Sequence, residues 1–149
     1  MSDLRAPVNP DSDSKPFWEA CQRREFVGQR CGSCGVWRWP PRAHCAVCHA
    51  RDPLWEALPG TGLIVGHVIV RRDLNPVFSK LLPLPIVHVA IDGTGGAMVL
   101  TSNLVQGQWP QVEVGKRVLV HFSRVRSDLI LPLFTLDYQT NQKGPVSDD

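Results

Sequence analysis

Four of the five cysteines are arranged as two pairs with metal-ligand spacing. They read C-G-S-C, ten further residues, then C-A-V-C, and are Cys31, Cys34, Cys45 and Cys48. Each Cys-x-x-Cys is a tight turn that brings two thiolates together, and two such turns supply the four soft sulfurs that structural zinc prefers. Because no coordination position stays open, the pattern predicts one structural zinc ion and argues against catalytic zinc. Iron in the same four-sulfur geometry, as in rubredoxin, is the alternative metal.

The other candidate side chains near this motif are Cys21, His44 and His49. Cys21 is a possible nucleophile, but no histidine lies near it in sequence to activate it, so we interpret it as a small packed hydrophobic residue. The two histidines each adjoin a ligand cysteine, and we interpret both as exposed. The sequence therefore predicts no catalytic residue.

A helix is predicted to precede the cysteines, beginning near Lys15. Asp13 and Ser14 offer an N-cap, Pro16 suits the first turn, and Gly28 is the expected stop. Four of the five tryptophans lie within residues 18–55. A unit this small buries little aliphatic core, so a metal and large aromatic rings are expected to hold it together.

The remainder of the chain predicts a small five-stranded barrel. Residues rich in β-branched side chains recur, without a second convincing helix, at 63–70, 86–91, 97–101, 117–122 and 131–136. The residues alone therefore predict a mainly β fold with an N-terminal helix, a zinc ribbon and then a small closed or half-closed barrel. The predicted organisation is a flexible tail (1–14), the helix and ribbon (15–56), the barrel (57–140) and a second flexible tail (141–149).

A long connection, residues 71–85, joins the first two predicted strands. It combines three prolines, three basic residues and apolar side chains, and a loop of this length in a compact barrel is functional or disordered. We interpret Arg71, Arg72, Phe78 and Lys80 as candidates for contacting a ligand or a partner protein. The alternative is that Phe78 and Leu81 plug the open barrel end, while the charges are ordinary solvated surface groups.

Composition restricts the classes of function. The chain has 149 residues, a mass of 16.6 kDa, 43% hydrophobic and 20% charged residues, and a net charge of +2. No apolar run is long enough to cross a membrane, and no secretory signal is recognisable, so we expect a cytoplasmic protein. The barrel segment (57–149) carries a net charge of only +1, from eight basic and seven acidic residues, which is a weak footprint for nucleic-acid binding.

Together these residues resemble the zinc-ribbon and OB-fold acyl-CoA-associated proteins, long catalogued as a domain of unknown function. The resemblance spans residues 15–138. It is carried by Pro16-Phe17-Trp18, the segment 29–35, Trp39-Pro40-Pro41-Arg42, Cys45 to Cys48, Trp55 and Gly60-Thr61-Gly62. The residue types at Ala46 and Trp39 depart from those of many relatives. The resemblance implies the fold class that we predict: mainly β with an N-terminal helix, and a rubredoxin-like zinc ribbon followed by a five-stranded OB-fold barrel (57–140). It also implies a small partner of thiolase-type enzymes or hydratases acting on CoA thioesters, in which the large subunit supplies the catalytic groups.

The functional prediction is a non-catalytic accessory subunit of a thiolase-like enzyme (thiolase, aldolase or acyltransferase) that acts on acyl-CoA. It would bind that enzyme in a hetero-oligomer and help to form the CoA channel, with a CoA thioester as candidate ligand at a shared site. The resemblance thereby makes Arg71, Arg72, Phe78 and Lys80 candidates for contacting CoA or the partner. The alternatives are a partner of a CoA-thioester hydratase, a single-stranded nucleic-acid binder of the zinc-ribbon/OB type, and an electron-transfer protein. We expect neither nucleic acid nor membrane as a partner.

Overall fold

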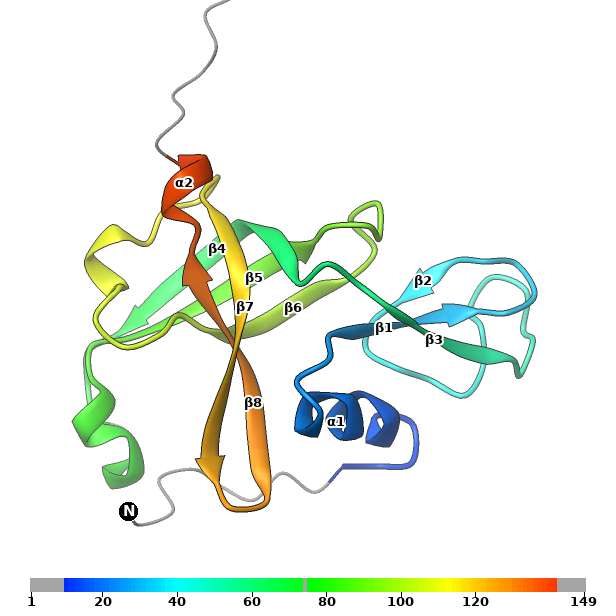
Figure 1. Ribbon diagram of the computed structural model, residues 1–149, viewed down its shortest axis with the longest axis horizontal. Helices are drawn as coiled ribbons and strands as arrows, with labels where there is room; N and C mark the ends of the chain where they lie inside the picture. Colours follow the sequence, from blue (N-terminus) through cyan, green and yellow to red (C-terminus); the bar gives the residue numbers. More distant parts are fainter. Residues whose placement is uncertain (1–9, 74, 142–149) are drawn as a thin grey trace, which may run out of the picture.

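The protein consists of two antiparallel sheets with one helix between them, as a computed structural model shows (Figure 1). The structure describes residues 10–73 and 75–141. In chain order the elements are α1 (Lys15–Gln22), β1 (Val27–Cys31), β2 (Trp37–Arg38), β3 (Pro53–Ala57), β4 (Thr61–Val70), β5 (Leu84–Ile91), β6 (Val99–Asn103), β7 (Arg117–Arg126), β8 (Leu129–Leu136) and α2 (Tyr138–Asn141), with 3-10 helices at Pro76–Leu81 and Trp109–Gln111. The mainly β class with an N-terminal helix is confirmed.

The smaller sheet is the ribbon, with strand order β2-β1-β3. Its central strand β1 places Gln29 between Arg38 of β2 and Trp55 of β3. Gly28 precedes Gln29, and a Cβ there would lie 2.7 Å from the Leu58 side chain and 3.0 Å from the Trp37 ring, so only glycine allows this close packing.

The larger sheet has the strand order β6-β5-β4-β7-β8, and each strand overlaps one of the five predicted segments. The sheet curls until its edges approach. Leu104 forms a parallel bridge with Phe134, and Ser102 Oγ donates a hydrogen bond to the Pro132 carbonyl over 2.7 Å. No ladder joins β6 to β8 in the described chain, so the sheet is OB-like but is not a fully closed barrel.

One hydrophobic cluster connects α1 to the inside of the curled sheet. Phe17 and Cys21 of α1 are buried with Ile64, Val89 and Phe134 of the sheet, among others. The Phe17 ring also makes edge-on contacts with Trp18, Phe26 and Trp39, at centroid distances of 5.3, 6.3 and 5.0 Å. Because Trp39 directly follows β2, this ring links the ribbon to the barrel core. The predicted domain limits stay a prediction.

The predicted helix boundary at Gly28 is wrong: α1 ends at Gln22, and Gly28 lies in β1. The backbone N–H of Glu25 donates to the Ala20 carbonyl and that of Arg24 to the Cys21 carbonyl, both over 2.9 Å. With Arg24 at φ 60°, this is a Schellman ending in which arginine takes the place that glycine usually occupies. Arg24 Nη1 also donates to the Phe122 carbonyl of β7, which ties this ending to the barrel.

The connection between β4 and β5 is more ordered than a loop. It contains the 3-10 helix Pro76–Leu81, whose N-cap residue Asn75 accepts a hydrogen bond from the Val77 N–H. Of the predicted tails, residues 10–14 form a turn in which Asp11 Oδ1 accepts from the Ser14 N–H, and residue 141 ends α2. The remaining tail residues, 1–9 and 142–149, lie outside the described residues. Within the described chain, no helix is long and apolar enough to span a membrane.

Candidate metal centre

The two Cys-x-x-Cys turns have the same backbone geometry. In the first, the Gly35 N–H donates to the Cys31 carbonyl and the Cys31 N–H to the Val36 carbonyl; in the second, His49 and Ala50 take these places around Cys45. All four hydrogen bonds measure 2.9–3.0 Å. Gly35 and His49 both have positive φ, 78° and 62°. The turns are therefore two copies of one knuckle, each presenting its pair of sulfurs in the same way.

The four sulfurs form a compact group. All four Sγ atoms lie within 4.8 Å of one another, and the Cys31–Cys48 and Cys34–Cys45 pairs are each 3.6 Å apart. A tetrahedral zinc ion with Zn–S bonds of about 2.3 Å requires sulfurs about 3.8 Å apart. Cys31 and Cys45 are buried, whereas Cys34 and Cys48 are at the surface. The donor set and its spacing fit a structural zinc ion, as the sequence predicted.

Backbone amides favour the thiolate form of the buried ligands. The N–H groups of Cys48 and Val47 point at the Cys45 sulfur and lower the pKa of that thiol to about 6. The Cys34 N–H, 3.5 Å from the Cys31 sulfur, likewise lowers the pKa of Cys31. Because the thiolate is the form that binds metal, the knuckle backbone prepares both cysteines as ligands.

Only some of the charged residues near the cysteines touch the knuckles. Arg30 Nε donates to the Gly35 carbonyl over 2.8 Å, while its Nη1 pairs with Glu56. Arg38 Nε and the Arg42 backbone N–H both donate instead to Gln29 Oε1, at 2.7 and 2.9 Å. Arg30 therefore adjoins the first knuckle, whereas the other two arginines adjoin Gln29.

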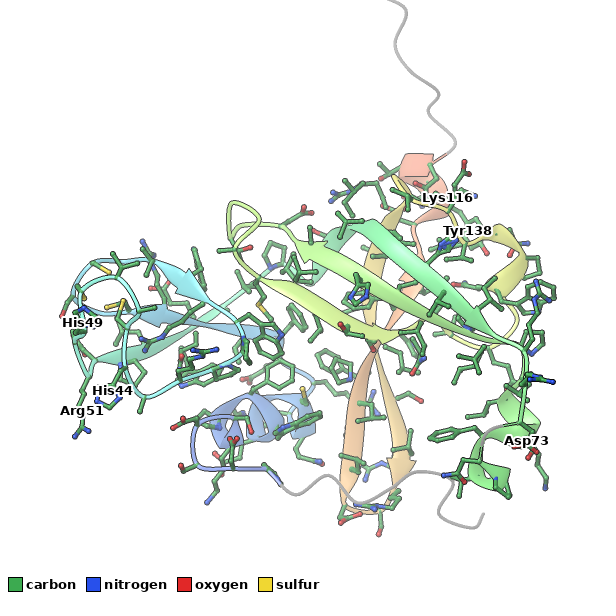
Figure 2. The ribbon with its side chains drawn as sticks, turned by 180° about the vertical axis from the view of Figure 1, so that it is seen from behind. His44, His49, Arg51, Asp73, Lys116 and Tyr138 are labelled. Atoms are coloured by element: carbon green, nitrogen blue, oxygen red, sulfur yellow. The ribbon has the colours of Figure 1, made fainter. Side chains whose placement is uncertain are left out.

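The two histidines next to the ligands are exposed, as predicted (Figure 2). His49 lies at the outer end of the ribbon, and His44 Nε2 accepts a hydrogen bond from Arg51 Nε. Four cysteine sulfurs already complete the ligand group, and neither histidine belongs to it. These residues therefore surround the centre rather than form it.

Cys21 has the environment of a packed residue, not of a nucleophile. It is fully buried in the core cluster between α1 and the barrel. Burial raises the pKa of its thiol to about 12, so the thiolate is absent at neutral pH. The interpretation of Cys21 as a small hydrophobic residue agrees with this position.

The candidate CoA- or partner-contacting residues lie at the end of the barrel away from the ribbon. Arg71, Arg72 and Lys80 are exposed, and Phe78 is half-buried. The Arg71 guanidinium stacks over the Trp109 ring at 5.0 Å from its centroid. No residue of the 3-10 helix is fully buried, so Phe78 does not belong to the barrel core. Contact of these residues with CoA or with a partner stays a prediction.

Among the described residues, the barrel offers no catalytic triad. Thr101 Oγ1 and His88 Nδ1 are 2.9 Å apart on exposed strand positions, but no described carboxylate hydrogen-bonds to His88. A nucleophile of the serine-hydrolase type needs such an orienting group.

Few aromatic rings are exposed on the described part of the barrel. Phe134 is buried and Phe122 packs against the core. These rings are not available for stacking on bases, which weakens the nucleic-acid alternative.

Comparison with known proteins identifies the ribbon. Residues 18–53 match the family described as "ChsH2, rubredoxin-like zinc ribbon domain". A solved structure titled "Ltp2-ChsH2(DUF35) aldolase" aligns with a TM-score of 0.76 and 26% identity, covering 89% of this chain and 98% of that one. A DUF35 protein of unknown function from Sulfolobus solfataricus shares the fold, with a TM-score of 0.59 and 14% identity over 85% of this chain and 86% of its own.

A curated relative comes from Thermomonospora curvata and is named "Probable enoyl-CoA hydratase alpha subunit". It is 30% identical over 133 residues, which is 87% of this chain but 39% of that protein. The chain thus spans about two fifths of the length of this relative. The resemblance to the zinc-ribbon and OB-fold family, also known as DUF35, is confirmed by the ribbon match and the structural neighbours.

Proposed function

We propose that this protein is a non-catalytic accessory subunit of an acyl-CoA enzyme, held in shape by one structural zinc ion. The observation that carries the proposal is the similarity, along nearly the whole chain, to the ChsH2 component of an aldolase. The name of the Thermomonospora relative supports acyl-CoA as the substrate class, since it refers to an enoyl-CoA hydratase subunit. Among the described residues no nucleophile is oriented for catalysis, which favours an accessory role over a catalytic one.

The preferred partner is a thiolase-like enzyme, and a CoA-thioester hydratase is the second candidate. The aldolase neighbour supports the first, and the hydratase relative supports the second. In either complex the partner supplies the catalytic groups. In the connection after β4, the Arg71 guanidinium is held over the Trp109 ring. This cation is already positioned, and we expect it to pair with a CoA phosphate or with an acidic residue of the partner.

Copurification followed by reconstitution tests the proposal. The untagged, zinc-loaded chain is purified from its source cells, and a stoichiometric companion is identified by mass spectrometry. A thiolase-like enzyme or a hydratase is expected, and its activity on acyl-CoA should fall at least tenfold without this chain. Full activity of the isolated companion, or thioester turnover by this chain alone, would refute the proposal.

The same reconstituted complex tests the residues near the barrel end. If Arg71 and Phe78 contact CoA, the variants Arg71→Ala and Phe78→Ala raise KM for the thioester with little change in complex formation. If they contact the partner, both variants weaken the complex instead. Arg124→Ala is the matched control, because Arg124 is exposed on β7 and its Nη1 donates a hydrogen bond to the nearby Ser127 carbonyl. Unchanged KM and unchanged assembly would remove these residues from the site.

A further inference from the structure

In the described chain, the outward-facing side of β4, β5 and β6 carries no lysine, arginine, aspartate or glutamate. Ile64, Val89 and Leu100 point into the buried cluster, so the alternate positions of these strands point away from the core. The strand register shows how those positions lie side by side. They form the outer face: Leu63, Gly66, Val68 and Val70 of β4, Leu84, Ile86, His88 and Ala90 of β5, and Val99, Thr101 and Asn103 of β6.

The three polar side chains of the outer face bond to the sheet itself. Thr101 Oγ1 and His88 Nδ1 are 2.9 Å apart, and Asn103 Nδ2 donates to the Pro85 carbonyl over 3.0 Å. The His88 ring lies beside Gly66, where a Cβ would be 3.4 Å from the ring. The outer face is therefore mainly apolar, and its polar groups are largely used within the sheet.

The apolar side chains of the outer face are open to solvent. Val68 is 56% exposed and Val99 38%, and Val65, at the β-bulge of β4, is 45% exposed. Helix α1 packs against β8 and β1, and α2 against β7; Figure 2 shows no helix in front of β4 and β5. Strands that are apolar on both sides are typical of sheets covered on both faces. The outer face thus has the composition of a covered surface.

The size of the outer face restricts what can cover it. Three strands about 4.8 Å apart, each about 25 Å long, give a plane of roughly 350–400 Å². Apolar patches of about this size on monomers are often functional. Two copies of this chain packed face to face would bury about 700–800 Å², less than the roughly 1,200 Å² of a stable interface. A stable partner therefore has to extend beyond the outer face.

Charged residues adjoin the outer face at one end. β4 passes from Val70 directly into Arg71 and Arg72, which are both exposed, and one acidic residue, Asp73, follows. An apolar core beside a charged rim is the usual anatomy of an interface between two different proteins. The rim here has an excess of positive charge, so it fits a partner with carboxylates at the corresponding edge.

We infer that the outer face is the docking surface for the acyl-CoA enzyme, an inference that rests on the proposed function. The enzyme covers Val68, Ile86 and Val99 with an uncharged, apolar surface and places acidic residues near Arg72. The zinc ribbon, at the other side of α1, is not needed for this contact.

Binding of the zinc-loaded chain to its copurified companion enzyme, measured by isothermal titration calorimetry, tests this inference. Val68→Lys and Val99→Lys should each raise the Kd at least about tenfold, because each places an ammonium group in an apolar interface. Val114→Lys is the matched control: Val114 is also 56% exposed, but it lies on the connection between β6 and β7. This variant should bind like the unmodified chain. Melting temperatures show whether the variants remain folded.

Photo-cross-linking locates the contact without adding a charge. The cross-linking amino acid p-benzoylphenylalanine at position 68 should link to the companion enzyme under ultraviolet light, and the same group at position 114 should not. Sedimentation equilibrium of the chain alone should show a monomer, and a dimer that Val68→Lys dissociates would assign the outer face to a second copy instead.

The outcomes separate this inference from the proposed function. Normal binding of both lysine variants of the outer face, or equal weakening by Val114→Lys, overturns the inference. In either case the complex with the companion enzyme still forms, so the accessory function stands. If no companion enzyme copurifies, both the accessory function and its docking surface are overturned.

Discussion

Replacing Phe17 by alanine is expected to destabilise the whole protein, because this ring joins the helix, the ribbon and the barrel. The side chain is 2% exposed and contacts three aromatic rings at centroid distances of 5.0–6.3 Å. Removing a buried phenylalanine ring costs about 3–5 kcal/mol, because apolar burial is lost and a cavity remains. The three edge-on contacts place Phe17 at the upper part of this range.

The assay is urea unfolding of the zinc-saturated chain, followed by circular dichroism and by tryptophan fluorescence. In a thermal melt of the same chain, a loss of about 4–5 kcal/mol corresponds to a fall in melting temperature of roughly 8–20 °C. Phe78→Ala is the matched control: the same atoms are removed from a half-buried position outside the core, and the expected loss is about 1 kcal/mol. If Phe17→Ala costs no more than Phe78→Ala, the described packing of α1 is wrong.

Four further predictions address the metal centre, the knuckles, the buried thiol and an ion pair. Elemental analysis should find one zinc ion per chain in a colourless protein that loses melting temperature on chelation; a red, iron-containing protein would contradict this assignment. Gly35→Ala should lower the free energy of unfolding by about 1 kcal/mol or more, because a side chain with a Cβ is strained at the positive φ of this position. His49→Gly should leave the free energy of unfolding unchanged or raise it slightly, because glycine removes that strain at the matching position of the second knuckle. Cys21 should resist alkylation at pH 8 until the chain is denatured, because burial raises its pKa to about 12. Asp92→Asn should cost about 1 kcal/mol or less at pH 7, because Arg117 donates to both Asp92 oxygens and lowers the pKa of that carboxyl. A lowered pKa means that this stabilisation is present above pH 4 and is lost as pH falls through the pKa in the folded protein, so the two unfolding curves should converge in acid.

The cysteine spacing was enough to predict the metal site, because two short turns leave few ways to arrange four sulfurs. The five barrel strands were also predictable, since their β-branched residues contrast with the glycine- and proline-rich turns. Their lengths were not. The strands β7 and β8 continue to Arg126 and Leu129 through polar residues, because that hairpin extends to α1 and the Asp128 carbonyl accepts a hydrogen bond from Gln22.

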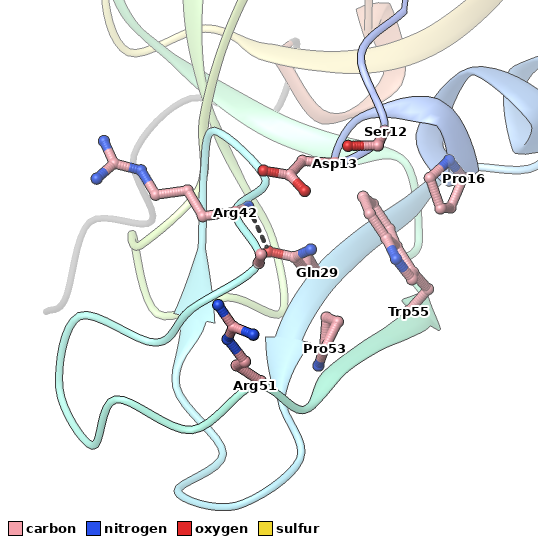
Figure 3. A pocket seen from close by; sticks show the side chains of 9 residues that line it. Ser12, Asp13, Pro16, Gln29, Arg42, Arg51, Pro53 and Trp55 are labelled. Carbon is pink, nitrogen blue, oxygen red and sulfur yellow. Dashed lines mark hydrogen bonds between the residues drawn. The ribbon is translucent and has the colours of Figure 1, made fainter.

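The end of α1 could not be predicted, because the usual signal is missing. Glycine commonly provides the positive φ that ends a helix, and the first glycine after α1 is Gly28. Arg24 adopts this conformation instead, and its hydrogen bond to Phe122 depends on a strand almost a hundred residues later. A pocket beside Gln29 could not be predicted for a similar reason (Figure 3). It combines residues from the turn before α1, β1, the second knuckle and β3, which are brought together only by the fold.

The position of α1 bears on how the protein can be divided in the laboratory. A fragment beginning at residue 57 would contain all five strands of the curled sheet, yet it would lack the phenyl ring and the thiol that fill the space beside Ile64 and Phe134. Such a fragment would expose part of its hydrophobic core to water and is expected to aggregate on expression. Truncation studies should therefore retain everything from the turn before α1, even when the barrel alone is of interest.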